Sequence, residues 1–257
     1  MTITSPHNER LKEIRKLARR RERALSGRFV AEGEDLLAAA DEAGWPAIER
    51  YCAAGSGLAG VEVGAELLAS VSQLGSGTRA LAVYEQRWAA APAGPLCVAL
   101  HAIADPGNVG AVLRSALAFG AASVALGPDC ADPYGPKAVR ASMGALFAVP
   151  VARYEAVGAL PGMVVALDAH AEQPIAALAA DGSVGSAAAA DGERGAPLTL
   201  LVGAERAGLP DEVLAAADRV ARIPIASESL NAAMAATVAL YEVTRGAVAT
   251  DHRMPTP

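Results

Sequence analysis

Aromatic residues and unbroken apolar runs are scarce in this chain of 257 residues. Aromatics make up 4% of the sequence, so core segments have to be recognised from their pattern rather than from bulky side chains. The longest uncharged stretch near the middle, residues 88–104, is interrupted by two prolines and a glycine, which argues against a membrane-spanning helix. The first 30 residues are too charged for a secretory signal, and we therefore expect a cytoplasmic protein.

Cysteine is also rare, and two common nucleotide-binding signatures are missing. Cys52, Cys97 and Cys130 are odd in number and widely separated, so the sequence predicts buried free thiols rather than a disulfide framework or a metal site. The chain contains neither the glycine fingerprint of dinucleotide-binding proteins nor a P-loop. These absences argue against a nicotinamide-dependent oxidoreductase and against a nucleoside-triphosphatase.

The composition is that of a soluble globular protein, but its charge is unevenly distributed. Hydrophobic residues make up 53% and charged residues 19% of the chain, and the net charge is −6. The first 30 residues contain nine basic and three acidic residues, whereas the remainder contains 13 basic and 25 acidic ones. A basic N-terminal arm is typical of polyanion binding, and it is equally consistent with a solvated helix face.

The pattern of apolar residues predicts an α/β protein with two units. Residues 1–86 form a small unit that begins with a basic helix within the first 24 residues and continues with a strand at 29–33. Residues 87–95 have the composition of a linker, and residues 96–250 alternate short apolar strands with helices, which is typical of a parallel sheet covered on both faces. Strands are expected at 96–100, 123–126, 147–151, 163–167, 198–202 and 219–223, helices at 109–119, 136–144 and 229–245, and a surface loop over 171–197.

Polar residues gather in three loops that follow predicted strands, where open α/β sheets bind their ligands. The first loop contains Asp105 and Asn108, either of which suits the N-cap of the next helix, and that helix carries Arg114 among apolar residues. A guanidinium on such a surface needs a partner, either a carboxylate of the same chain or an external anion such as phosphate. The sequence leaves both readings open.

The second and third loops lie in the last quarter of the chain. Gly203 and Glu205 follow the strand predicted at 198–202, and a glutamate there suits the capping of local amides or the holding of another loop. The third loop precedes a helix of small residues, for which Ser227 or Ser229 is the expected N-cap.

Together the three loops resemble the signature motifs of the SpoU (TrmH-type) branch of the SPOUT RNA methyltransferases. The motifs are formed here by Asn108, Gly110 and Arg114, by Gly203, Glu205, Gly208 and Leu209, and by Ile223, Pro224, Ser229, Leu230 and Asn231. The third loop is shorter than is usual in that family and lacks its glycine. Residues 5–8, the basic helix and residues 29–33 are similar to the L30e-like substrate-binding domain of the same family, so the resemblance covers nearly the whole chain.

The resemblance implies a C-terminal domain with a trefoil knot, S-adenosylmethionine as cofactor, a homodimer, and methylation of a ribose 2′-hydroxyl in RNA. The two-domain layout favours ribosomal RNA over tRNA by analogy. A non-catalytic RNA-binding protein is the alternative from another class, and the short third loop is its best support. The cofactor-binding residues implied are Leu201, Gly203, Ile223, Ser229, Leu230 and Asn231.

The resemblance also assigns roles in the reaction. Arg114 and Asn108 are expected to be catalytic, with Asn108 orienting Arg114 or the ribose. Glu205, Ser229 and Asn231 are expected to shape the loops and hold Arg114, and Glu205 and Gly208 are the supporting residues. Because a guanidinium is a very poor general base, we expect Arg114 to bind a phosphate and stabilise the developing alkoxide rather than take a proton. No metal is expected. The residues expected to bind RNA phosphates are Arg15, Lys16, Arg19, Arg20, Arg21 and Arg23.

Overall fold

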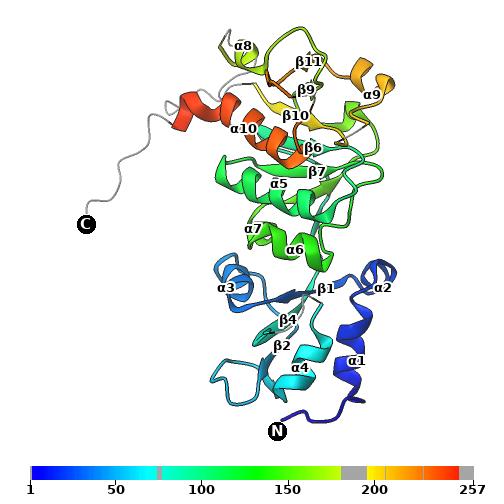
Figure 1. The fold of residues 1–257 in the computed structure, drawn as a ribbon, viewed down its shortest axis with the longest axis vertical. Helices are drawn as coiled ribbons and strands as arrows, with labels where there is room; N and C mark the ends of the chain where they lie inside the picture. Colours follow the sequence, from blue (N-terminus) through cyan, green and yellow to red (C-terminus); the bar gives the residue numbers. More distant parts are fainter. Residues whose placement is uncertain (1, 74–76, 181–195, 206, 228, 249–257) are drawn as a thin grey trace, which may run out of the picture.

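The computed structural model describes residues 2–73, 77–180, 196–205, 207–227 and 229–248, which form two lobes stacked along the long axis of the molecule (Figure 1). The first lobe contains a four-stranded sheet and the second a seven-stranded sheet, so the predicted α/β class is confirmed. All three cysteines are buried and free of disulfides, as predicted. Within the described ranges, no helix has the length and apolar character needed to cross a bilayer.

The first lobe builds its sheet in the order β1-β4-β2-β3. Its strands are β1 (Arg28–Glu32), β2 (Glu49–Ala53), β3 (Val61–Val63) and β4 (Ala80–Glu85), and its helices are α1 (Glu9–Lys16), α2 (Arg20–Ser26), α3 (Glu34–Glu42) and α4 (Ala65–Val71). The N-terminal stretch predicted as one basic helix is divided into α1 and α2. The break is stabilised because the Arg23 guanidinium donates to the carbonyls of Leu17 and Ala18, at 2.9 and 2.8 Å.

The second lobe has the strand order β11-β9-β10-β6-β7-β8-β5, and all its neighbouring strands run parallel. The strands are β5 (Trp88–Ala89), β6 (Leu96–Leu100), β7 (Ser123–Leu126), β8 (Val151–Arg153), β9 (Met163–Leu167), β10 (Leu198–Val202) and β11 (Arg219–Ala221). The helices are α5 (Pro106–Ala118), α6 (Pro136–Ser142), α7 (Ala145–Ala148), α8 (Ile175–Ala180), α9 (Asp211–Ala215) and α10 (Ala232–Val248), with a short 3₁₀ helix, η1 (Val157–Ala159).

Several expectations for this lobe are corrected. The strand predicted at 147–151 is wrong, because residues 145–148 form α7 and β8 begins only at Val151. Leu146 and Phe147 are buried on that short helix, and a brief apolar run does not distinguish a buried helix from a strand. The predicted linker contributes β5, which pairs with β8. The predicted loop at 171–197 contains α8, and residues 181–195 lie outside the described residues.

The order of the strands creates a crevice beside β6. The chain passes from β6 through β7 to β8 on one side, and then returns through β9 to β10 on the other side. Leu100 at the end of β6 is paired with Val202 at the end of β10, so the loops after both strands start side by side. A reversal of this kind opens a binding crevice at the carboxyl ends of the strands.

The few aromatic residues are concentrated where the two lobes meet. Phe29, Trp45 and Tyr84 of the first lobe pack against Tyr134 and Phe147 of the second, and these are five of the ten aromatic residues in the chain. The ring centroids of Phe29 and Tyr134 are 4.9 Å apart, and those of Trp45 and Tyr84 each lie 5.2 Å from the centroid of Phe147. The two lobes therefore share one hydrophobic core.

A buried ion pair crosses the same junction. Arg23 on α2 donates through Nε and Nη2 to Oδ2 of Asp132, at 2.9 and 2.7 Å. The two side chains are only 5% and 15% exposed. The prediction that Arg23 contacts RNA is corrected, because its guanidinium is buried and occupied by Asp132 and by the end of α1.

Removing Arg23 should destabilise the whole molecule. Arg23→Ala leaves the Asp132 carboxylate partly buried without a cation, and we expect the free energy of unfolding to fall by about 3 kcal/mol, measured by urea denaturation. Arg21→Ala, at an exposed position on the same helix, serves as the control and should change it by less than about 0.5 kcal/mol. Equal effects of the two substitutions would contradict the structural role of the pair.

Candidate active site

Helix α5 starts at the crevice, and its N-terminal residues explain where Asn108 lies. Asp105 is the N-cap, because its carboxylate accepts a hydrogen bond from the Gly107 backbone N–H at 2.6 Å, and Pro106 at the first helical position suits this start. Of the two candidate caps in the sequence, the structure therefore uses Asp105. The Asn108 side chain remains available for contacts outside its own helix.

A small hydrogen-bond network, formed by Asn108, Glu205 and Asn231, ties the three loops together. Glu205 Oε1 accepts hydrogen bonds from Nδ2 of Asn108 and from Nδ2 of Asn231, the latter at 2.8 Å. Asn231 Nδ2 also donates to Asn108 Oδ1 at 3.0 Å. These contacts join residues up to 123 positions apart in the chain. One carboxylate thus fixes the loop after β10 to the starts of α5 and α10.

Asn231 has a second role as the cap of α10. Its Oδ1 accepts from the backbone N–H groups of Ala233 and Met234, at 3.0 and 3.2 Å. The helix accordingly begins at Ala232 rather than at 229, and neither of the serines expected as its cap is used. The last motif residue therefore serves both helix formation and the network.

Arg114 lies on α5 fewer than two turns beyond Asn108 and is exposed. It makes no hydrogen bond or ion pair with any residue that the structure describes. The expectation that Glu205, Ser229 and Asn231 hold it is not met among the described residues. Glu205 and Asn231 bind each other and Asn108 instead, and Ser229 lines the neighbouring cavity. The five N–H donors of Arg114 are consequently free for an external anion, which favours the second of the two readings from sequence.

A cavity of about 230 Å³ lies beside the network at the carboxyl ends of the strands. Four of the six predicted cofactor residues line it, together with Glu205 and Gly208; these are Gly203, Ile223, Ser229 and Leu230. Leu201 does not, because it is buried within β10, and Asn231 lies in the adjoining network.

Gly203 is required by the turn that forms one wall of this cavity. A Cβ atom at this position would lie 2.6 Å from the carbonyl carbon of Gly208 and 2.7 Å from the backbone nitrogen of Leu209, closer than side-chain atoms tolerate. The glycine allows the loop to fold back on itself in front of β10.

Sequence reasoning missed two polar residues of the cavity, Asp168 and His170, which follow β9. A carboxylate oxygen of Asp168 accepts from the backbone N–H of His170 at 3.3 Å, so the turn between them is hydrogen-bonded. Their signal in the sequence is a polar pair directly after the apolar segment 163–167. No cluster of three or more His, Cys, Asp or Glu side chains suited to a metal ion occurs among the described residues.

Comparison with known proteins places this geometry in a family. The model of the SpoU rRNA Methylase family matches residues 95–241, more than half of the chain. The chain belongs to the SpoU rRNA methylase family. The model of the MRM3-like substrate binding domain matches residues 8–86 of this SpoU family protein, which include most of the first lobe.

Two relatives and one solved structure illustrate the similarity. A 23S rRNA (uridine-2′-O)-methyltransferase of Streptomyces viridochromogenes is 40% identical over 143 residues, which are 55% of this chain and about half, 49%, of that relative. An uncharacterized tRNA/rRNA methyltransferase of Synechocystis is 31% identical over 95% of this chain and 93% of its own length. The AdoMet-bound rRNA methyltransferase of Sinorhizobium meliloti is 29% identical with a TM-score of 0.79, covering 96% of this chain and 98% of its own.

Loss of the Glu205 carboxylate should loosen the active-site loops of this SpoU protein without unfolding it. In Glu205→Ala the amides of Asn108 and Asn231 lose their common acceptor, so backbone amides at 203–209 should exchange hydrogen at least about fivefold faster. Because the network is exposed, the free energy of unfolding should change by about 1 kcal/mol or less.

Glu205→Gln is the matched control, since its remaining carbonyl oxygen still accepts from both amides. Unchanged exchange in Glu205→Ala would show that the loops are held by other contacts.

Proposed function

We propose that this protein transfers a methyl group from S-adenosylmethionine to a ribose 2′-hydroxyl of ribosomal RNA. The observation that carries the proposal is the Asn108–Glu205–Asn231 network, which brings three loops together beside a cavity. Arg114 lies next to it and makes no hydrogen bond or ion pair with the described residues. The names of the Streptomyces and Sinorhizobium proteins support ribosomal RNA. The name of the Synechocystis relative keeps tRNA as the second candidate. A ribosomal RNA substrate would place the protein in the cytoplasm.

The residues of the cavity fit the proposed cofactor. When bound, S-adenosylmethionine would supply a methyl group on a positively charged sulfonium, whose sulfur leaves as a neutral thioether and needs no acid. Leu167, Ile223 and Leu230 provide apolar walls suited to a flat heterocycle. Asp168 provides a carboxylate suited to accept hydrogen bonds from ribose hydroxyls. The shorter third loop therefore still contributes a wall to the cavity, which argues against the degenerate, non-catalytic alternative.

The chemistry left to the protein is to position the RNA and to stabilise charge on the attacking oxygen. Because a guanidinium is a very poor general base, the role of Arg114 is to bind a backbone phosphate beside the target ribose and to stabilise the developing alkoxide. A guanidinium can donate two parallel N–H bonds to one phosphate, whereas the ammonium of a lysine acts as a single point charge and binds it with less geometric definition. Asn108, oriented by Glu205, fixes the start of the helix that carries Arg114. A water molecule or the phosphate itself accepts the proton.

The exposed residues of α2 and its N-terminus are proposed to bind the phosphates of the same RNA. Arg19, Arg20 and Arg21 are exposed, whereas Arg15 donates to the Pro6 carbonyl and Lys16 is paired with Glu13. We accordingly treat residues 1–86 as the substrate-binding domain, 87–95 as the connection, and 96–250 as the methyltransferase domain.

A homodimer is supported by an apolar face on α5 and α10. Its exposed side chains are Leu117, Met234, Val238 and Tyr241, with exposed fractions of 48%, 61%, 36% and 52%. A surface of this kind is typical of a protein–protein interface. Leu117 lies one turn beyond Arg114 on α5, so the second copy would lie next to Arg114 of the first.

Methyl transfer with Arg114 variants tests the reaction. With labelled S-adenosylmethionine and RNA lacking the modification, wild type should label large-subunit ribosomal RNA and not tRNA. Arg114→Ala should lower kcat by about 100-fold or more, and Arg114→Lys should recover only part of the loss because a lysine cannot bind bidentately. Cofactor affinity, measured by calorimetry, should be unchanged in both.

The alternatives make different predictions in the same assay. Label in tRNA alone would select the second substrate. The wild-type protein would be a non-catalytic RNA-binding protein if it bound RNA but neither bound S-adenosylmethionine nor transferred label.

The proposed dimer is tested by light scattering. Wild type should have twice the mass of one chain at micromolar concentration, and Tyr241→Glu should dissociate it, because a carboxylate in an apolar interface is desolvated without a partner. Glu66→Gln, at an exposed position in the first lobe, should leave the mass unchanged. A monomeric wild type would contradict the proposal.

A further inference from the structure

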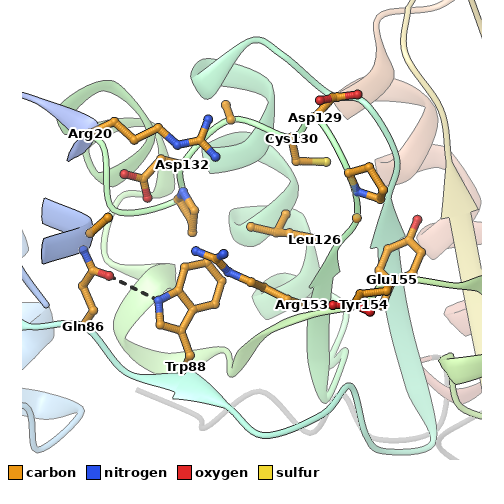
Figure 2. A pocket seen from close by; sticks show the side chains of 15 residues that line it. Arg20, Gln86, Trp88, Leu126, Asp129, Cys130, Asp132, Arg153, Tyr154 and Glu155 are labelled. Atoms are coloured by element: carbon orange, nitrogen blue, oxygen red, sulfur yellow. Dashed lines mark hydrogen bonds between the residues drawn. The ribbon is translucent and has the colours of Figure 1, made fainter.

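A second cavity, of about 370 Å³, lies between the two lobes (Figure 2). Its first-lobe side is formed by Arg20 and Ala24 on α2, and its second-lobe side by residues after β7 and β8. We call it the interlobe cleft. Of its lining residues, the function proposed above uses only Arg20, as one of the phosphate-binding arginines of α2. The shape of the cleft is fixed by the shared aromatic core and by the Arg23–Asp132 pair behind it.

The centre of the cleft contains a flat, positively charged stack. The Arg153 guanidinium carbon lies 4.3 Å from the centroid of the Trp88 ring, and Figure 2 shows it over that ring in the middle of the cleft. Two contacts fix the position of Trp88. Its Nε1 donates to Gln86 Oε1 at 3.2 Å, and its ring packs edge-to-face with Tyr134, with 5.2 Å between the ring centroids. Arg153 forms no ion pair with any described residue. Its planar group is consequently pre-positioned, and no described residue accepts a hydrogen bond from it.

The charges around this stack are separated by sign. Arg20, which is exposed and also makes no ion pair with the described residues, lies across the cleft from Arg153 (Figure 2). The exposed carboxylates of Asp129 and Glu155 lie on the second-lobe wall. The remaining carboxylate, that of Asp132, is neutralised by Arg23. One part of the cleft therefore suits a phosphate, and another suits hydrogen-bond donors.

The wall of the cleft is hydrogen-bonded to the loop after β6, which leads to Asn108 and which we call the reactive loop. This wall follows the carboxyl ends of β7 and β8, the same sheet edge from which the Asn108 loop rises. Ala131 N–H donates to the Ile103 carbonyl at 2.8 Å, and Ala102 N–H donates to the Pro128 carbonyl at 3.0 Å. The Cys130 thiol, whose pKa is raised by burial so that it stays protonated, donates to the Leu100 carbonyl at 3.2 Å. The wall of the cleft and the start of the reactive loop thus form one hydrogen-bonded unit.

We propose that the interlobe cleft binds one unpaired nucleotide of the RNA substrate, close in the chain to the nucleotide that is methylated. Its base stacks on the free face of the Arg153–Trp88 pair, its phosphate is bound by Arg20, and the amino edge of the base donates to Asp129 or Glu155. A phosphate group alone would leave the stacking face unused and would be repelled by the two carboxylates. This proposal rests on the proposed function, because it requires an RNA substrate.

Binding of unmodified large-subunit ribosomal RNA, measured by filter retention at several salt concentrations, tests the proposal. Arg153→Ala should weaken binding by about tenfold, and Arg153→Lys by nearly as much, because lysine keeps the charge but not the plane. Arg20→Ala should weaken binding and make its salt dependence shallower. Arg219→Ala is the matched control, an exposed arginine on β11 at the opposite edge of the sheet, and should bind like wild type.

Cofactor affinity should be unchanged in all four variants, since none of them lines the other cavity. Wild-type RNA affinity in Arg153→Ala would overturn the proposal whatever the effect of Arg20→Ala, because Arg20 also belongs to the phosphate-binding arginines of α2. Wild-type affinity in Arg153→Lys would overturn the stacking. Tight binding of free guanosine or adenosine monophosphate, with RNA binding unaffected by the substitutions, would assign the cleft to a free nucleotide instead. Methyl transfer by wild type with unaffected RNA binding in the variants would refute the cleft and leave the proposed function standing. RNA binding that is weakened by the substitutions, in a protein that transfers no methyl group, would support the cleft and refute the proposed function.

Discussion

The carboxylate of Glu205 is the contact on which the arrangement of the active site depends. It accepts amide hydrogens from Asn108 and Asn231, which start two different helices, and it stands in a loop that follows a third element, β10. Without this acceptor, the loop after β10 would lose its contacts with both helix starts, and of this network only the Asn231–Asn108 hydrogen bond would remain. Oε1 of Glu205 is engaged by the amides, and Arg114, exposed on α5, makes no hydrogen bond or ion pair with the part of the chain that the structure describes. In the proposed function, the same contact fixes the loops and leaves the arginine for a phosphate.

A second constraint comes from the junction of the lobes. Proteins of two domains commonly move about a thin polar interface. Here the scarce aromatic residues are gathered at the junction, and a buried ion pair between Arg23 and Asp132 lies beside them. The arginines of α2 are therefore held at a constant distance from the carboxyl edge of the second sheet. In the proposed function, a rigid relation of this kind would let RNA contacts on the first lobe position a nucleotide at the carboxyl edge of the second sheet.

The sequence could predict the features that depend on local pattern. Apolar segments bounded by glycine, proline and polar residues placed β6, β7, β9 and β10, and the helix around Arg114 followed from its spacing. Predictions failed where burial or tertiary contact decides. Arg23 has the same charge as Arg21, but its side chain is buried. Residues 145–148 form a buried helix, and a short apolar run does not distinguish such a helix from a strand. Likewise, no local signal places Arg153 over Trp88, 65 positions away. The trefoil knot, inferred from resemblance alone, stays a prediction.

The position of the transferred methyl group tests the central claim most directly. Alkali cleaves RNA through attack by the 2′-hydroxyl, so a methylated ribose protects the bond that follows it. Large-subunit ribosomal RNA labelled by the wild-type protein should, after complete alkaline hydrolysis, yield its label in an alkali-resistant dinucleotide. Recovery of the label in mononucleotides would show that a base is methylated, and it would contradict the account of Arg114 and the ribose oxygen.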